Sequence, residues 1–405
     1  MTNSKKRMAF DMLLNIVASA VPLCVLQLVV LPLIAADMSG DSYGLVVTML
    51  SLFSMGPGVL GTVLNNIRLV YEEKYRSIGV VGDFNYLLVV CSAIGIMFVC
   101  LSYLALDSFD AVVVLLAAAT SITWICNSYF IVAFRLIINY KAILISSLFQ
   151  SAGYAFGFAL YAISDQWMLI YLFGQLCSLA YILSHGKLQY EPVCKTELFS
   201  SVTKESVSLA ISHFLSSAMT YADRLLLFPL IGGSGVGVYY VSTLVGKILS
   251  MAVNPINSVV LTYLAKSANK PVKTFYTALG LGTLVCVFAY IVILLSSRPI
   301  LSLLYPVYVD EAMKYVWVTS ATALVFVLIS IAQPFTLKFY SMKWQIAING
   351  LTCIVYIGMG MGLFFAYGLM GFCVGVLIAN IVRLATMLAI NAFIKPDSMS
   401  IELEE

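Results

Sequence analysis

Four ionisable side chains stand inside long apolar stretches of this sequence: Asp223, Arg224, Lys247 and Arg383. A charge at the centre of a membrane-spanning helix costs roughly 2.5–3.5 kcal/mol even on a lenient scale, so each of these residues needs a compensating partner or a function. Three cations facing a water-filled cavity would attract an anionic substrate. The alternative is structural pairing, for instance of Asp223 with a basic residue on another helix.

The depth of these residues follows from the predicted helix ends. At 1.5 Å per residue, Arg224 lies roughly 11 Å below the outer end of its helix, Lys247 roughly 18 Å and Arg383 roughly 20 Å. Snorkelling to the surface can explain Arg224 but hardly the other two. Asp223 either binds a coupling proton or cation, or acts as a counter-ion, and we expect the counter-ion role. Because adjacent residues on a helix do not face each other, we do not expect Asp223 to pair closely with Arg224.

Motifs of known catalytic centres are absent from the sequence. It has no P-loop, no HExxH, no GxSxG and no paired-carboxylate spacing, which excludes Walker-type ATP hydrolysis. The nine cysteines are scattered without metal-ligand spacing, and the only histidines are His185 and His213. The sequence therefore predicts a protein that is not an enzyme and that needs no metal or other cofactor.

Composition indicates where the chain resides. Of its 405 residues, 61% are hydrophobic and only 10% are charged, and the mean hydropathy is +1.00. Soluble domains are about 25% charged, and one bilayer crossing needs about 20 apolar residues. The apolar segments are too long and too uniform for the strands of a barrel. We therefore predict an all-α integral membrane protein with about twelve helices, near 11–36, 43–66, 84–106, 110–134, 142–163, 167–184, 206–231, 235–264, 274–295, 311–336, 344–366 and 370–394.

The basic residues predict the orientation, because Lys and Arg concentrate on the cytoplasmic side. With the N-terminus inside, the outer connections hold only Arg298 and Lys314 and are otherwise acidic, with Asp37, Asp41, Asp107, Asp110, Asp165, Asp310 and Glu311. Both termini are then cytoplasmic. The predicted inner side carries seventeen basic residues: Lys5, Lys6, Arg7, Arg68, Lys74, Arg76, Arg135, Lys141, Lys187, Lys195, Lys204, Lys266, Lys270, Lys273, Lys338, Lys343 and Lys395.

The longest inner connection divides the chain into halves. We predict an N-terminal six-helix bundle at 1–184, a cytoplasmic linker at 185–204, a C-terminal six-helix bundle at 205–395 and a cytoplasmic tail at 396–405. Two six-helix halves in one orientation form the parallel-repeat arrangement of many carriers. An internal echo supports it, since PLIAADMSGDSYGLVVTMLS from Pro32 and PLIGGSGVGVYYVSTLV from Pro229 share an apolar end, a turn of small residues and a new apolar start.

Polar residues inside the helices have a structural or a functional interpretation. Buried amides such as Asn65, Asn127 and Gln175 could line a sugar path, but hydrogen bonding between helices is the commoner role and the one we expect. Three tryptophans, Trp167, Trp317 and Trp344, fall near predicted helix ends and are interpreted as interfacial anchors.

The segment 221–266 carries a family resemblance. It reads YADRLLLFPLIGGSGVGVYYVSTLVGKILSMAVNPINSVVLTYLAK and resembles the seventh and eighth helices of the lipid-linked polysaccharide (O-antigen, Wzx-type) flippases of the multidrug/oligosaccharidyl-lipid/polysaccharide (MOP) superfamily. The segments 299–320 and 367–385 fit as well, although LLYPVY stands at 303–308 where the family often has Phe-Gly after the two leucines. The residues that fill the pattern of the first segment are Asp223, Arg224, Gly232, Gly237 and Tyr239.

The resemblance implies a function. Such proteins move an oligosaccharide repeat unit on undecaprenyl diphosphate across the bacterial cytoplasmic membrane for O-antigen or capsule-like polymers. It implies alternating access and partners that include membrane lipids and other polysaccharide-assembly proteins, but no nucleic acid, for a chain expected to be a monomer. The three cations in apolar segments are consistent with this function, since Arg224, Lys247 and Arg383 would bind the diphosphate and lower the free-energy cost of moving it through lipid.

Three alternatives are less favoured. A multidrug or small-molecule antiporter of the same superfamily would prefer acidic residues in its cavity, whereas Asp223 stands against three cations. A membrane-embedded enzyme of envelope polysaccharide assembly is expected to carry a large outer loop with arginine or a buried histidine, and neither is evident. A major-facilitator carrier is disfavoured because 67–83 lacks the Gly-Asp-Arg-Arg motif.

Overall fold

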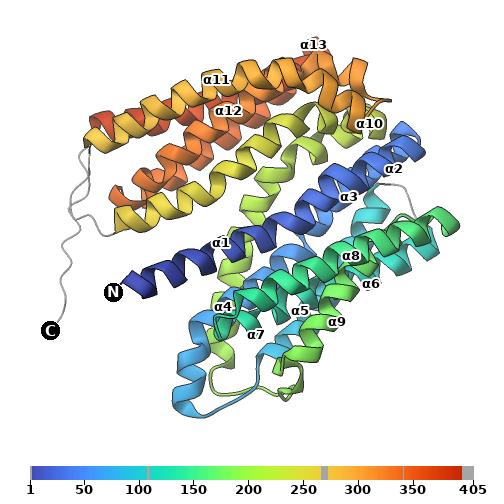
Figure 1. Ribbon diagram of the computed structural model, residues 1–405, viewed down its shortest axis with the longest axis vertical. Helices are drawn as coiled ribbons and strands as arrows, with labels where there is room; N and C mark the ends of the chain where they lie inside the picture. Colours follow the sequence, from blue (N-terminus) through green and yellow to red (C-terminus); the bar gives the residue numbers. More distant parts are fainter. Residues whose placement is uncertain (1, 107–109, 266–271, 341, 395–405) are drawn as a thin grey trace. The chain divides into compact units, whose positions relative to one another are not determined.

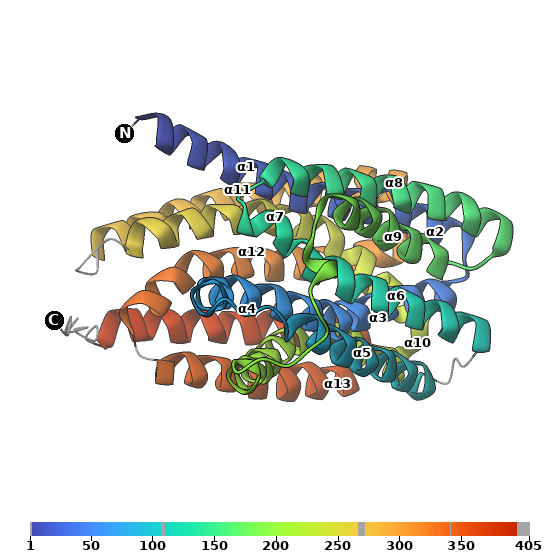
Figure 2. The same ribbon diagram turned by 90° about the horizontal axis from the view of Figure 1, so that it is seen from below.

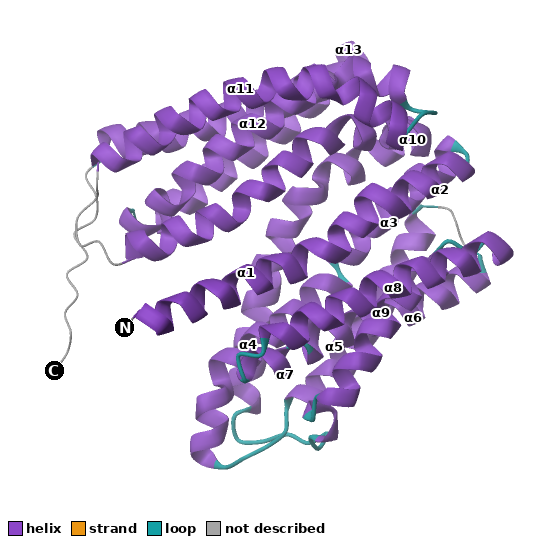
Figure 3. Ribbon diagram, viewed as in Figure 1, coloured by secondary structure: helices purple, strands orange, loops and turns teal. Residues whose placement is uncertain are grey.

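The computed structural model describes residues 2–106, 110–265, 272–340 and 342–394. Within these ranges the regular structure is helical and no strand occurs (Figure 3). The predicted tail at 396–405 lies outside the described residues, as do Asp107, Lys266 and Lys270. By its contacts the chain forms two compact units, residues 1–236 and 237–405. The predicted division into six helices and six helices stays a prediction.

The first unit is built around α6. This helix packs against α4, α5 and α9, and α8 lies alongside both α1 and α9 (Figures 1 and 2). A π-helical turn at Leu26–Val30 joins α1 to α2. The helices are α1 (Thr2–Val25), α2 (Leu31–Asp37), α3 (Gly40–Met55), α4 (Pro57–Ile78), α5 (Phe84–Ala105), α6 (Ala111–Phe130), α7 (Val132–Leu136), α8 (Tyr140–Ser164), α9 (Met168–His185) and the first part of α10 (Phe199–Ala265).

The second unit holds the rest of α10 together with α11 (Val272–Leu304), α12 (Val309–Phe339) and α13 (Met342–Phe393). Helix α12 packs against both α11 and α13. Aromatic side chains fill part of its core, where the ring centroids of Phe275 and Phe335 are 5.0 Å apart.

Ten helical stretches of the described chain are long and apolar enough to span a membrane. Two of them, in α10 and α13, are broken at Gly232 and Gly368, whose φ angles of 70° and 60° are accessible to glycine at little cost. After Gly368 the chain folds back on itself, since a Cβ placed on Gly375 would lie 2.6 Å from the carbonyl oxygen of Met359. Dividing both stretches at these glycines gives twelve apolar segments. The predicted all-α membrane fold is confirmed.

The connection at 67–83, between the helices predicted near 43–66 and 84–106, is largely helical. Helix α4 continues to Ile78 because Glu72 forms ion pairs one turn away in both directions, at 3.1 Å to Arg68 and 3.5 Å to Arg76. Gly79, with φ of 74°, then ends the helix in the left-handed conformation. Apolar length alone missed these last turns because they are charged.

The unusual LLYPVY segment forms a short turn between α11 and α12. Tyr305 and Tyr308 are both buried there, and the Tyr308 N–H donates to the Tyr305 carbonyl at 3.0 Å. The Ala312 N–H then donates to the Tyr308 carbonyl at 2.8 Å and begins the next helix. Buried aromatic side chains thus hold the turn without the Phe-Gly pair.

Buried amides connect helices, as predicted. Asn127 on α6 donates from Nδ2 to Oε1 of Gln175 on α9 at 2.6 Å and accepts from Ser178 at 3.0 Å. Asn65 on α4 donates to the Ser128 carbonyl on α6 at 2.9 Å. These hydrogen bonds fix the register of α4 and α9 against α6 in the first unit.

The connection between α9 and α10 is docked onto the ends of α4 and α5. Arg68 on α4 is buried, and its two terminal nitrogens donate to the Glu191 carboxylate at 2.8 and 3.2 Å. Its guanidinium lies 4.9 Å from the centre of the Phe84 ring. Asn85 donates to the carbonyls of Leu188 and Glu191 at 3.0 and 2.8 Å. The predicted linker is therefore held by specific contacts.

The turns of the two echoing segments, at Asp41–Gly44 and at Gly233–Ser234, meet within the first unit. The Ser234 N–H, directly after the break in α10, donates to Oδ1 of Asp41 in the first turn of α3 at 2.9 Å. The backbone of Gly44 lies against that of Gly233, and a Cβ on Gly44 would come within 1.8 Å of the Gly233 carbonyl oxygen. Two glycines thus allow the two turns to pack backbone to backbone.

Gly44→Ala should therefore lower the thermal stability of the detergent-solubilised protein. Overpacking of this kind costs about 1–3 kcal/mol. Gly350→Ala is the matched control, since a Cβ there meets nothing within 4 Å. That change should be neutral or stabilising by up to about 1 kcal/mol, because alanine favours a helix interior. Equal melting temperatures for the two variants would contradict the packing.

Candidate binding site

Arg224 is buried within α10. Its Nη1 donates to Oγ of Ser51 on α3 at 2.6 Å, and Ser51 in turn donates to the Val47 carbonyl at 2.9 Å. The guanidinium carbon lies 5.7 Å from the ring centre of Tyr221, three residues earlier. A neutral hydroxyl and an aromatic ring therefore position this cation.

Asp223 is also buried and directs Oδ1 toward its own helix, where it accepts from the Arg224 backbone N–H at 2.9 Å. A carboxylate oxygen that accepts such a bond is oriented by the local backbone. This geometry agrees with a counter-ion role, which stays a prediction.

On the flippase function that the sequence predicts, Asp223→Asn should lower transport moderately, by about tenfold or less, and keep its pH dependence. The amide preserves the shape and the bond to the backbone but removes the charge on which the predicted counter-ion role depends. The measurement is transport in reconstituted vesicles across a pH series. A variant that still exchanges substrate between leaflets, yet no longer responds to an imposed proton gradient, would instead make Asp223 the coupling group.

Lys247 and Arg383 belong to the second unit. Lys247 is half-buried on α10, with Nζ 5.7 Å from the ring centre of Tyr240. Arg383 is half-buried on α13 and its Nε is buried. Among the described residues, no side chain or carbonyl forms a hydrogen bond or ion pair with the Arg383 guanidinium. A shared cavity for all three cations stays a prediction.

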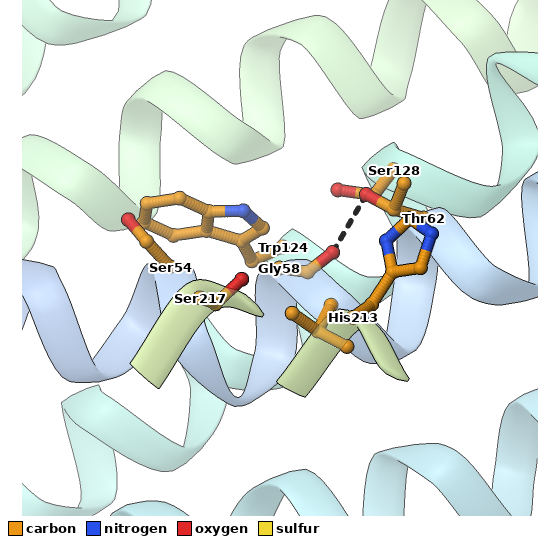
Figure 4. A pocket seen from close by; sticks show the side chains of 8 residues that line it. Ser54, Gly58, Thr62, Trp124, Ser128, His213 and Ser217 are labelled. Atoms are coloured by element: carbon orange, nitrogen blue, oxygen red, sulfur yellow. Dashed lines mark hydrogen bonds between the residues drawn. The ribbon is translucent and has the colours of Figure 1, made fainter. Parts of the chain in front are cut away.

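The first unit contains a pocket of about 300 Å³ that no pattern in the sequence predicts. The indole of Trp124 lies across it, with the hydroxyls of Ser54 and Ser217 toward one end and Thr62, Ser128 and His213 at the other (Figure 4). Its walls come from α3, α4, α6 and α10, with Ser54, Gly58, Val59, Thr62, Trp124, Ser128, His213 and Ser217 as lining residues.

Helical spacing joins this pocket to Arg224. On α10, Ser217 and Arg224 are seven residues apart, which places them on one face two turns from each other. Ser51, which contacts Arg224, precedes Ser54 by three residues on α3. The arginine and the pocket therefore follow one polar stripe between α3 and α10.

Comparison with known proteins shows which solved structures share this fold. No known family profile and no curated protein sequence matches the chain. A crystal structure of MATE in complex with MaL6 matches with a TM-score of 0.63 at 12% identity, covering 93% of this chain and 94% of that one. The Vibrio cholerae MATE transporter VcmN in its bent form matches at 0.56 and 14% identity, over 96% and 97%. The lipid II flippase MurJ, in an inward closed conformation, matches at 0.55 and 12% identity, over 96% and 87%.

The chain has the fold shared by the MATE transporters and MurJ. It is accordingly a multi-pass membrane protein with the architecture of transporters and flippases. The solved proteins of this fold include MATE transporters and a lipid II flippase, so the fold alone does not identify a function. The most distinctive features of this chain are the cations Arg224, Lys247 and Arg383, which lie in helical stretches long and apolar enough to span a membrane, and the polar pocket beside Trp124.

Proposed function

We propose that this protein is a flippase that moves an undecaprenyl-diphosphate-linked oligosaccharide across the bacterial cytoplasmic membrane for surface polysaccharide synthesis. The observation that carries the proposal is Arg383. Its guanidinium lies within a membrane-spanning helix, with Nε buried and no partner among the described side chains. Because an uncompensated charge in a membrane helix is costly, its presence favours an anionic ligand.

A diphosphate fits this requirement. It carries negative charge through a layer that strongly disfavours charge, and guanidinium and ammonium groups are its usual protein partners. Arg224, Lys247 and Arg383 would bind the diphosphate in turn or together, while the polyprenyl tail stays in lipid. Alternating access would follow from rocking of the halves. Both termini would be cytoplasmic, and other polysaccharide-assembly proteins would be the partners.

The second candidate is a multidrug or small-molecule antiporter. Its support is the likeness to several MATE crystal structures. A site for cationic compounds would need carboxylates, and Asp223 is the only acidic residue that the sequence places well inside a helix. The lining of the described pocket contains no carboxylate. These features favour the lipid-linked oligosaccharide.

Deletion of the gene in its bacterial host separates the two functions. We expect loss of a surface polymer together with accumulation of its lipid-linked repeat unit, and restoration of the polymer by the wild-type gene. An intact surface polymer combined with new sensitivity to cationic dyes would favour the antiporter and overturn the proposal.

A further inference from the structure

We propose that the pocket beside Trp124 binds one sugar ring of the glycan head group, close to the diphosphate. This inference rests on the proposed flippase function and deepens it by assigning a sugar site. The pocket lies wholly within the first unit, between α3, α4, α6 and α10 (Figure 4). Its volume of about 300 Å³ is at the lower end of the roughly 300–1,000 Å³ typical of ligand pockets, which suits a single ring of a longer substrate.

The pocket presents unused hydrogen-bonding groups. Among the described residues, none forms a hydrogen bond with Nε1–H of Trp124, with the His213 ring, or with the hydroxyls of Ser128 and Ser217. The indole nitrogen only donates, whereas hydroxyl and imidazole groups can donate or accept. A ligand with several hydroxyls, each both donor and acceptor, matches this mixed set better than a purely cationic or purely anionic one.

Two further hydroxyls in the pocket are oriented by their own helices. Ser54 donates to the Leu50 carbonyl at 2.9 Å, and Thr62 donates to the Gly58 carbonyl at 2.7 Å. Their donor protons are thereby used, so each oxygen offers an acceptor to the pocket. Fixed acceptors from α3 and α4, together with free donors from α6 and α10, give the site polarity without charge.

An aromatic wall completes the site. The indole of Trp124 stacks on Phe53 with the ring centroids 5.9 Å apart and the planes 8° from parallel. This contact orients the indole, and Trp124 and Val59 both line the pocket. A sugar ring has an apolar face of C–H groups beside its hydroxyls, and flat aromatic surfaces pair with such faces through dispersion and weak hydrogen bonds.

The proposed sugar and diphosphate positions differ in the charge of the side chains around them. The lining contains no Lys, Arg, Asp or Glu. The nearest cation on the same helix face is Arg224, two turns or about 10 Å beyond Ser217. An anion held near Arg224 would therefore leave a sugar within reach of the neutral pocket.

The test compares two probes on the purified, full-length protein: undecaprenyl diphosphate alone, and the same lipid carrying one N-acetylglucosamine. We expect the wild type to bind the sugar-bearing probe about tenfold more tightly. Ser217→Ala and, independently, Trp124→Phe should reduce that ratio to near one without changing the affinity for the bare lipid. Ser216→Ala is the matched control, since Ser216 is exposed and does not line the pocket, and it should keep the tenfold ratio.

The outcomes are distinguishable. Binding of the bare lipid with no gain from the sugar, or a gain that persists in both pocket variants, overturns the sugar site and leaves the flippase function standing. Failure of the wild type to bind either probe overturns the flippase function and the sugar site with it. Loss of the tenfold ratio in Ser216→Ala as well would show that the effect is not local, and would also overturn the site.

Discussion

Arg383→Glu should lower transport of the lipid-linked oligosaccharide by at least about 100-fold while the protein still folds. The wild-type guanidinium has no partner among the described residues, so its replacement breaks no ion pair within them. Reversing the charge removes an attraction for the diphosphate and adds a repulsion, and a 100-fold loss corresponds to about 2.7 kcal/mol. The measurements are transport in reconstituted vesicles and the melting temperature of the same preparation.

Arg383→Lys and Arg298→Glu are the two controls for this result. Arg383→Lys keeps the charge and should retain much of the activity. For the same reason, Lys247→Arg should be better tolerated than Lys247→Glu. Arg298→Glu is the matched charge reversal, because the Arg298 side chain is 70% exposed and lies 3.3 Å from the exposed Asp310. It should transport like the wild type. Normal transport by Arg383→Glu would remove the main support for an anionic substrate.

Arg68→Ala should lower the free energy of unfolding by about 3–5 kcal/mol at neutral pH. This loss is larger than the one expected for Gly44→Ala. The substitution leaves the largely buried Glu191 carboxylate without its bidentate partner, and breaking a buried ion pair from one side typically costs that much. Arg76→Ala is the control, since Arg76 also pairs with Glu72 but is 82% exposed. Exposed pairs contribute about 1 kcal/mol or less, so this variant should melt close to the wild type.

The loss in Arg68→Ala should depend on pH. Burial raises the pKa of the Glu191 carboxyl above its ordinary value; Arg68 opposes the rise and Glu72 adds to it. Without Arg68 that pKa should rise further. A carboxyl with a raised folded-state pKa binds more protons in the folded than in the unfolded chain, so stability falls as pH increases. The variant should therefore be closer to the wild type at pH 5 than at pH 8, and the opposite trend would contradict the assignment.

Much of the fold was predictable because membrane crossings leave a strong sequence signal. Apolar length located the helical segments, and the small residues around Gly232 and Gly368 marked the breaks within α10 and α13. Apolar length does not predict the last turns of α4 because they are charged, and the charge pattern identifies Arg68 only as one basic residue of the inner side. Its role depends on Glu191, 123 positions away, and no local pattern reveals such a partner.

The candidate site was predictable only in its charges. Arg224, Lys247 and Arg383 stand out because a cation in an apolar segment is rare. The pocket residues do not, since serine and threonine are ordinary in membrane helices and the lining comes from segments more than 150 positions apart. One usable signal was Trp124, which lies far from the ends of its predicted helix, unlike Trp167 and Trp344.

Movement of the substrate between leaflets is the central claim, and reconstituted vesicles test it most directly. Undecaprenyl-diphosphate-linked oligosaccharide is placed in both leaflets, and a glycosidase that cannot cross the membrane is added outside. Protein-free vesicles should protect the inner-leaflet share of the glycan, wild-type vesicles should lose it, and Arg383→Glu vesicles should behave as if protein-free. Wild-type vesicles that protect the same share as protein-free ones, yet expel a cationic dye under an imposed ion gradient, would contradict the account.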